Sequence, residues 1–270
     1  MDFRAFDGSV HLGYGLTPND SDPPLLLLPP LGRDRSSWRA QAPFLAEHYR
    51  TITPDTRGTG TSRDALDGFT IDQFATDALV ILDELGVGEV HVAGWSMGAA
   101  VAMELAIQAP DRVRSLSLYT PWARTDADLE ARFLVMRELT ETGSDLVGVE
   151  EHTLRLILSP EALAGIPDLR EAAAAATRDP GYPSRKALIG HLDASIAHDV
   201  LEALGAVACP ALVVGGEHDA LTPACLARQV AASIPGAEYV EMSGSTASHA
   251  LPLELADDFN ALARDFLDRH

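Results

Sequence analysis

The pentapeptide Gly94-Trp95-Ser96-Met97-Gly98 decides the fold that this sequence predicts. It follows the apolar run Val90–Ala93, which is typical of a buried strand, and it opens a stretch of small apolar residues over 97–109 that is typical of a buried helix. In a sharp turn between strand and helix, a serine hydroxyl stands exposed above the sheet edge, and the flanking glycines avoid a backbone clash. The pattern therefore indicates a nucleophilic serine at position 96.

Strand patterns alternate with helix patterns on both sides of this turn, which is the signature of a mostly parallel α/β sheet. Apolar or β-branched runs predict strands at 25–28, 49–53, 90–93, 113–118, 211–215 and 237–242. Helical periodicity predicts helices at 71–85, 97–109 and 223–233 and at the C-terminus. Before the first of these strands, Phe3–Phe6 and Val10–Leu16 predict a hairpin that turns at Asp7-Gly8.

Between residues 121 and 204 the strand patterns stop and amphipathic helices follow one another. These helices are predicted over 126–140, 145–158, 168–177 and 184–198, with Pro160, Pro167, Pro180 and Pro183 as helix-stopping residues. We therefore expect a helical cap at 121–204, inserted into an α/β core that is formed by residues 1–120 and 205–270.

A nucleophilic serine needs a base, and the base needs an acid to orient it. Asp219 comes just after the apolar strand Ala211–Gly215, so it should reach the carboxyl edge of the sheet. His249 lies in the loop between the last strand and the last helix. The chain order Ser96, Asp219, His249 therefore predicts a nucleophile, an orienting acid and a general base.

These motifs resemble those of the α/β-hydrolase superfamily, in particular its capped group of esterases, enol-lactonases, carbon–carbon bond hydrolases and cofactor-free haloperoxidases. The resemblance spans essentially the whole chain and includes Leu25–Gly32 and Asp55–Ser62 as well as the turns at Ser96, Asp219 and His249. It implies the α/β-hydrolase fold, with a mostly parallel eight-stranded sheet flanked by helices. It also implies an acyl-enzyme formed on the serine, with no metal and no organic cofactor.

The resemblance further implies an oxyanion hole made by the backbone N–H groups of Leu31 and Met97. Where the family usually has His-Gly-x-Gly, this chain has Pro29-Pro30-Leu31-Gly32. Prolines lack an N–H, but Leu31 keeps its own. The change also removes a histidine that usually helps to fix this loop. Around the base, the family's short Gly-x-Gly-His is replaced by the longer stretch Ser243–His249.

Five residues are candidates for the substrate pocket: Trp95, Trp122, Arg33, Tyr182 and His191. Arg33 could pair with a substrate carboxylate or could lie at the surface. We expect a serine hydrolase that cleaves a carboxylic ester or lactone of a small to medium, largely apolar molecule. The same three catalytic residues would also suit a carbon–carbon bond hydrolase, a thioesterase or a perhydrolase, and the scaffold could serve a biosynthetic cyclase, a lyase or a small-molecule receptor.

The charge of the chain disfavours several classes of partner, and its cysteine content argues against a disulfide framework or a metal site. The 270 residues include Asp+Glu 40 against Lys+Arg 20, a formal net charge of −20, which disfavours nucleic acids and anionic membranes. The same charge favours a neutral small-molecule substrate. Cys209 and Cys225 cannot build a disulfide framework and lack metal-ligand spacing. No apolar signal segment or membrane span is visible, so we expect a cytoplasmic protein, either a monomer or a homodimer.

Overall fold

The computed structural model of the protein describes residues 2–6, 11–17 and 23–270. Its centre is an eight-stranded sheet in the order β1-β2-β4-β3-β5-β6-β7-β8, in which every neighbouring pair from β4 to β8 is parallel. The strands are β1 (Asp2–Phe6), β2 (His11–Leu16), β3 (Pro24–Leu28), β4 (Arg50–Pro54), β5 (Val90–Trp95), β6 (Val113–Tyr119), β7 (Ala211–Gly216) and β8 (Glu238–Met242). The predicted, mostly parallel, eight-stranded sheet is confirmed.

Strands β1 and β2 form the expected N-terminal hairpin, in antiparallel register with Phe3 opposite Tyr14. Its turn at Asp7-Gly8 lies outside the described residues. Strand β2 then pairs antiparallel with β4, which attaches the hairpin to the edge of the parallel part of the sheet.

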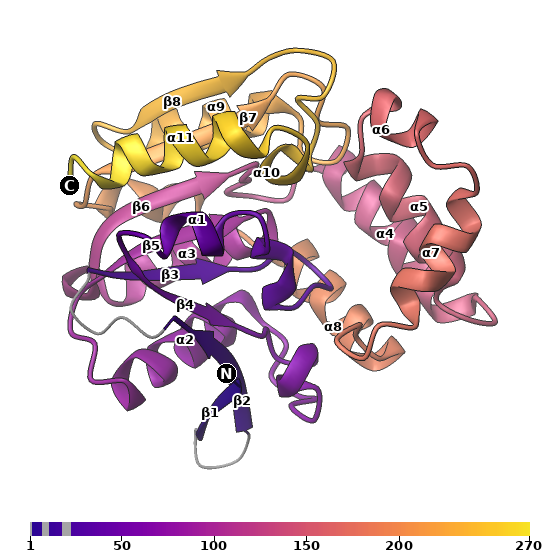
Figure 1. Cartoon of the computed structure of the whole chain (residues 1–270), viewed down its shortest axis with the longest axis horizontal. Coiled ribbons are helices and arrows are strands. Elements are labelled where there is room, and N and C mark those ends of the chain that lie inside the picture. The colour runs from indigo at the N-terminus through magenta and orange to yellow at the C-terminus, as the bar shows by residue number, and fades with distance from the viewer. Residues whose placement is uncertain (1, 7–10, 18–22) are drawn as a thin grey trace.

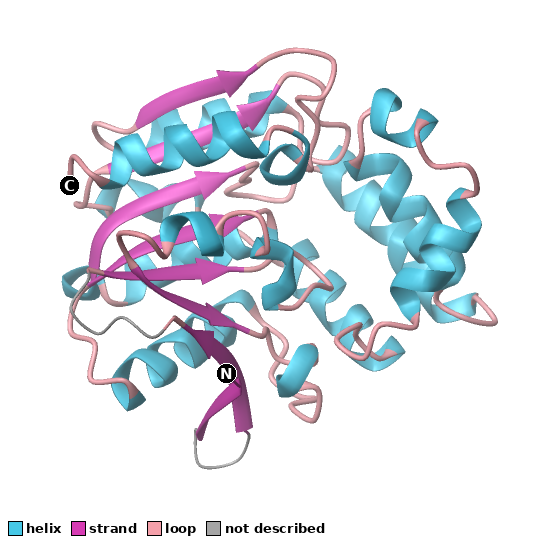
Figure 2. Cartoon of the chain, viewed as in Figure 1, coloured by secondary structure: helices cyan, strands magenta, loops and turns pink. Residues whose placement is uncertain are grey.

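Helices cover both faces of the sheet (Figures 1 and 2). These helices are α1 (Ala42–Leu45), α2 (Ile71–Glu84), α3 (Met97–Gln108), α9 (Ala224–Ser233), α10 (Leu251–Glu254) and α11 (Ala256–Leu267). On the central strand β3, Leu26 and Leu28 pack with residues of α2 and α3, whereas Leu25 and Leu27 pack with residues of α1 and α11. Burying both faces explains why this strand is a continuous apolar run, and each buried leucine contributes roughly 1.5–3 kcal/mol.

Five helices between β6 and β7 lie together beside the carboxyl ends of the strands (Figure 1). They are α4 (Ala127–Thr142), α5 (Val147–Ile157), α6 (Pro160–Ala164), α7 (Leu169–Thr177) and α8 (Arg185–Ile196). Helix α6 was not expected, because Pro160 was interpreted as a helix stop. Proline fits the first position of a helix, where its missing N–H has no partner to lose, and the Ser159 side chain caps the helix by accepting the Ala162 N–H. The boundaries of the predicted cap stay a prediction.

Four histidines of the described residues are buried, and apart from His249 they are His91 on β5, His191 on α8 and His198 just after α8. Burial lowers the pKa of each of these three imidazoles to about 4. The His91 Nδ1 lies 2.7 Å from the Ser115 hydroxyl, so this ring also has a polar partner on the neighbouring strand. All three rings are therefore neutral at pH 7.

These histidines predict that the fold loses stability in mild acid. In the unfolded chain each takes up a proton near its ordinary pKa of about 6.5, whereas in the folded chain it stays neutral down to about pH 4. Lowering the pH from about 6.5 toward 4 therefore favours the unfolded chain, by up to about 1.4 kcal/mol per pH unit for each histidine. Urea unfolding at pH 7, 6 and 5 should show this fall.

The variant His91→Asn keeps a polar atom near Ser115 and should give a shallower fall in the free energy of unfolding. The matched control is His218→Asn, because the His218 side chain is 50% exposed. This control should leave the dependence of the free energy of unfolding on pH unchanged. If the free energy of unfolding fell equally steeply with pH in wild type and in His91→Asn, this prediction would be contradicted.

Candidate active site

Ser96 stands in the turn between β5 and α3 with φ 56° and ψ −117°, a conformation that few residues other than glycine adopt. Its N–H donates a hydrogen bond to the Tyr119 carbonyl at 2.9 Å, which helps to hold the turn. A Cβ atom on Gly98 would lie 2.1 Å from the Leu28 carbonyl oxygen, and one on Gly94 would lie 2.2 Å from the Gly98 carbonyl oxygen. The two glycines thus allow α3 to start directly against β3 and β5.

Asp219 lies in the loop between β7 and α9 and is buried. Its Oδ1 accepts the N–H groups of Leu221 at 2.9 Å and Thr222 at 2.8 Å. Its Oδ2 lies 3.0 Å from the Thr222 hydroxyl and 2.8 Å from the His249 Nδ1. These bonds fix the orientation of the carboxylate toward the imidazole ring.

Thr222 is a residue of the site that the sequence analysis did not single out. Its hydroxyl lies 3.0 Å from Asp219 Oδ2, 3.1 Å from His249 Nδ1 and 3.1 Å from the Thr120 carbonyl oxygen. A hydroxyl three residues after a turn aspartate was the available signal, because such side chains commonly close local turns. The threonine links the acid, the imidazole ring and the end of β6.

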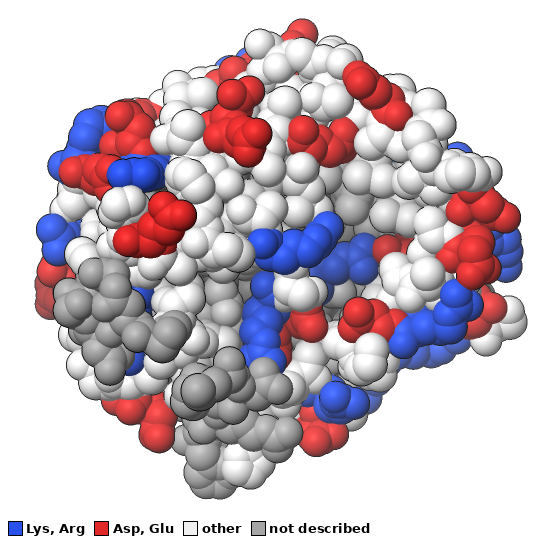
Figure 3. Space-filling model, in the orientation of Figure 1, with Lys and Arg blue, Asp and Glu red and all other residues white. Residues whose placement is uncertain are grey.

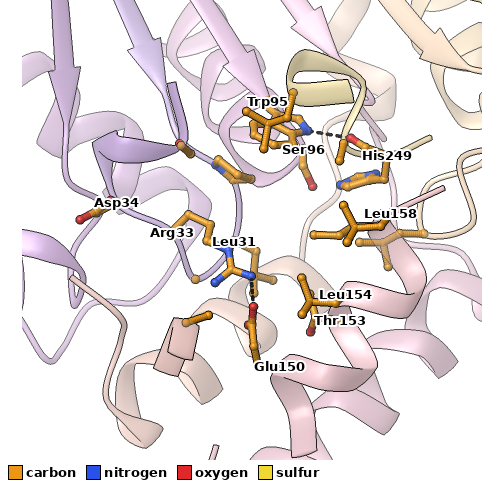
Figure 4. Close-up of a pocket in the computed structure, with 18 of the residues that line it drawn as sticks. Leu31, Arg33, Asp34, Trp95, Ser96, Glu150, Thr153, Leu154, Leu158 and His249 are labelled. Carbon is orange, nitrogen blue, oxygen red and sulfur yellow. Dashed lines mark hydrogen bonds and ion pairs between the residues drawn. The ribbon is translucent and has the colours of Figure 1, made fainter. Parts of the chain in front are cut away.

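His249 lies in the loop between β8 and α10 and is 3% exposed. Because its Nδ1 proton is directed at Asp219, its Nε2 is left as a hydrogen-bond acceptor. Figure 4 shows the Ser96 hydroxyl and the His249 ring facing each other, and both residues line the same cavity. This arrangement can pass a proton from the serine to the histidine while the aspartate holds the ring.

The long loop that carries His249 is fastened from two sides. The Trp95 indole N–H donates a hydrogen bond to the His249 carbonyl at 3.0 Å (Figure 4). On the other side, the Ala250 N–H donates to the Ile157 carbonyl at 3.0 Å, at the end of α5. Trp95 therefore both lines the cavity and holds the loop of the histidine.

The two residues expected to form an oxyanion hole are Leu31 and Met97, the residue that directly follows Ser96. Leu31 lines the cavity, in the loop that follows β3. Met97 has a buried side chain and is the first residue of α3, so its N–H has no partner within the helix. Within the described part of the chain, neither N–H donates a hydrogen bond to another residue. The oxyanion hole itself stays a prediction.

His191 does not line the cavity, and its position differs from the one expected from the sequence. Its Nδ1 accepts the Gly32 N–H at 3.2 Å, and its Nε2 donates to the Arg57 carbonyl at 2.7 Å. Arg57 in turn forms a two-point ion pair with Asp77 on α2, at 2.7 and 2.6 Å. An imidazole from α8 thus fixes the loop after β3, which lacks the histidine usual in the family.

The cavity above Ser96 has a volume of about 360 Å³. Trp95, Trp122, Arg33 and Tyr182 all line it, and the sequence had indicated these four as pocket candidates. Much of the remaining wall is apolar and comes from α4 and α5, which supply Phe133, Met136, Leu154 and Ile157. Glu150 on α5 also reaches the cavity, and no sequence signal separated it from an ordinary surface glutamate.

Two further findings concern the described residues as a group. None of their helices combines the length and the apolar character that crossing a membrane requires. Among these residues there is also no group of three or more His, Cys, Asp or Glu that could hold a metal ion.

The close contact at Gly98 predicts a strong effect of a single methyl group. In Gly98→Ala the added Cβ would meet the backbone of β3, which has no flexible side chain to move aside, so unfolding should become easier by roughly 1–3 kcal/mol. The matched control is Gly88→Ala, where an added Cβ meets nothing within 4 Å. Thermal unfolding should show a lower Tm for Gly98→Ala alone, and equal Tm values for the two variants would contradict this.

Comparison with known proteins gives consistent matches over nearly the whole chain. The profile of the family described as alpha/beta hydrolase fold matches residues 23–248. A candidate carbamate hydrolase, RutD, from Azorhizobium caulinodans is 30% identical over 262 residues, which is 97% of each chain. A hydrolase from Pseudomonas aeruginosa PA01 is 27% identical, with a TM-score of 0.88 over 98% of both chains. The enol-lactonase from Burkholderia xenovorans LB400 is 25% identical, with a TM-score of 0.88 over 98% of this chain and 100% of that one. The chain therefore belongs to the alpha/beta hydrolase family.

Proposed function

We propose that this protein is a serine hydrolase that cleaves a carboxylic ester or lactone of a small to medium molecule. The observation that carries the proposal is the arrangement of Ser96 opposite His249, whose other ring nitrogen is hydrogen-bonded to the buried Asp219. Membership of the alpha/beta hydrolase family and similarity to an enol-lactonase support this class of reaction.

In the first half of the proposed reaction, the Ser96 Oγ attacks the carbonyl carbon of the substrate and its proton passes to the His249 Nε2. The carbonyl oxygen becomes an oxyanion, which the N–H groups of Leu31 and Met97 stabilise. When this intermediate collapses, the bond to the leaving oxygen breaks and that oxygen takes the proton from the histidine. The acyl group remains on the serine as an ester. In a lactone the leaving hydroxyl stays attached to the acyl group.

In the second half, water attacks the acyl-enzyme and gives a proton to the His249 Nε2. The same oxyanion hole stabilises the second tetrahedral intermediate. Collapse then releases the carboxylic acid, and the proton returns to the Ser96 oxygen. Asp219 keeps the imidazole in the required tautomer and stabilises its cation throughout, without taking the proton itself.

The cavity supports a compact substrate. Its volume of about 360 Å³ lies near the lower end of the range of about 300–1,000 Å³ that is usual for small-molecule sites. Helices α4 and α5, which lie beside the carboxyl ends of the strands (Figure 1), contribute lining residues that are largely apolar.

A carbamate is the second candidate substrate, because the chain is 30% identical to the candidate carbamate hydrolase RutD over 97% of its length. A carbamate presents the same carbonyl carbon to Ser96, with nitrogen on one side of it. The two candidates are distinguished by rate: neutral esters and lactones are turned over faster than matched carbamates if the first proposal holds.

Ser96→Ala removes the proposed nucleophile and should lower kcat on the best ester or lactone by at least about 10⁴-fold, because the remaining groups cannot form the acyl-enzyme. The measurement is steady-state hydrolysis of a panel of neutral esters, lactones and carbamates by wild type and by this variant. The proposal would be overturned if Ser96→Ala were as active as wild type, or if wild type hydrolysed no member of the panel.

Asp219→Asn keeps the shape of the acid but presents an N–H to His249 Nδ1. The ring would then carry its proton on Nε2 and could no longer accept one from Ser96, so kcat should fall on the order of 10⁴-fold while KM changes little. Circular dichroism checks that the variant is folded. A folded Asp219→Asn protein with nearly wild-type kcat would show that Asp219 does not orient the base.

A further inference from the structure

One wall of the cavity holds a charged cluster that the proposed chemistry does not use. Arg33 from the loop after β3, Glu150 from α5 and Tyr182 just before α8 all line the cavity. The Arg33 Nη2 donates a hydrogen bond to the Glu150 Oε1 at 2.6 Å, and the Tyr182 hydroxyl donates to the Glu150 Oε2 at 3.0 Å. The Arg33 guanidinium also lies 5.6 Å from the centre of the Tyr182 ring. Figure 4 shows the Arg33 side chain extending between the loop of Leu31 and Glu150.

The cluster is electrically neutral as a whole. Burial acts to lower the pKa of Arg33, but the neighbouring Glu150 carboxylate raises it above its ordinary value, so the guanidinium stays charged. Burial, together with the same carboxylate, raises the pKa of Tyr182, so its hydroxyl stays protonated and acts as a donor. One cation and one anion therefore balance inside the wall.

Arg33 and Glu150 differ in how many of their hydrogen-bonding groups remain unused. Both oxygens of Glu150 are engaged, and its side chain is only 3% exposed. Arg33 is 26% exposed, and within the described residues its side chain makes no hydrogen bond other than the one to Glu150. A guanidinium has five N–H donors, so most of those of Arg33 remain free at the cavity. A purely apolar substrate that filled the cavity would cut these donors off from water without replacing their hydrogen bonds.

A negatively charged substrate group suits this wall poorly. Glu150 already balances the charge of Arg33, so a carboxylate would place a second anion beside one buried cation. Asp34, Asp179 and Arg39 also line the cavity. Together with Arg33 and Glu150 they give the lining two basic and three acidic side chains, so the wall as a whole stays slightly negative. Figure 3 shows basic side chains beside acidic ones at the hollow between the sheet part of the molecule and helices α4–α8.

We propose that Arg33 is a substrate-binding residue that donates hydrogen bonds to a second, uncharged oxygen of the ester or lactone, such as a ketone carbonyl. Glu150 and Tyr182 act as positioning residues, and Glu150 also selects against substrate carboxylates. This inference rests on the proposed function and narrows its substrate from a largely apolar molecule to one with an oxygen acceptor near the reacting carbonyl.

The test uses two matched sets of three esters. In the first set the acyl group is 4-methylpentanoyl, 4-oxopentanoyl or 3-carboxypropanoyl on 4-nitrophenol, three groups of nearly the same shape. In the second set the acyl group is always butanoyl, and the alkyl, ketone or carboxylate group is placed at the end of the alcohol. The measured quantity is the ratio of kcat/KM for the ketone ester to that for the alkyl ester. In at least one set, this ratio should be roughly tenfold or more higher in wild type than in the double variant Arg33→Met/Glu150→Gln. That double variant removes the donors without leaving a buried carboxylate unpaired.

Glu150→Gln leaves the cation of Arg33 unbalanced. In that variant the ratio of kcat/KM for the carboxylate ester to that for the ketone ester should rise at least about tenfold over wild type. The matched control is Glu151→Gln, the same change of charge at the next position of α5, where the side chain pairs with Arg155 and does not line the cavity. It should leave the ratio unchanged.

Equal use of ketone and alkyl esters by wild type in both sets would overturn the inference, as would a carboxylate ratio that Glu150→Gln moves no more than Glu151→Gln does. If Glu150→Gln does not fold, the wild-type ratios decide by themselves. In each of these cases continued hydrolysis of the alkyl esters leaves the proposed function standing, whereas a wild type that hydrolyses none of the esters contradicts the proposed function instead.

Discussion

The contact between α3 and β3 is the constraint on which the site depends. Gly98 lies so close to the Leu28 carbonyl that only a hydrogen fits there, and this contact lets the chain turn at Ser96 with a φ of 56°. The same strand β3 leads directly into the loop that carries Leu31. A single backbone packing contact therefore places both the proposed nucleophile and one of the two proposed oxyanion donors, and the burial of β3 by apolar residues on both faces keeps that contact in register.

Helices α5 and α8 contact the loop after β3, and the end of α5 also contacts the loop that carries His249. His191 on α8 holds Gly32, Glu150 on α5 holds Arg33, and the Ile157 carbonyl at the end of α5 holds the loop of His249. The segment between β6 and β7 thus does more than cover the cavity, because it fixes the loops on both sides of Ser96. It follows that substrate-facing and loop-holding residues of this segment are interleaved, so changes in specificity here also act on the geometry of the proposed catalytic groups.

Much of the fold, and the placement of the candidate catalytic residues, could be predicted from local sequence. Apolar runs mark the strands, and a glycine pattern with a clear steric reason marks the turn at Ser96; Asp219 and His249 follow from chain order and position at strand ends. The roles of His191 and Glu150 did not follow, because each depends on how a helix far along the chain packs against the loop after β3. Helix α6 was missed because a proline that stops one helix also starts the next.

The central claim is that Ser96 is an activated nucleophile, and labelling with a fluorophosphonate tests it most directly. Intact-mass analysis should show one label on wild type, peptide mapping should place it on Ser96, and Ser96→Ala and His249→Ala should lose it. Ser37→Ala should retain it, because Ser37 also lines the cavity but its hydroxyl is buried and has no hydrogen-bond partner among the described residues. No label on wild type, or a label that persists in Ser96→Ala, would contradict the account.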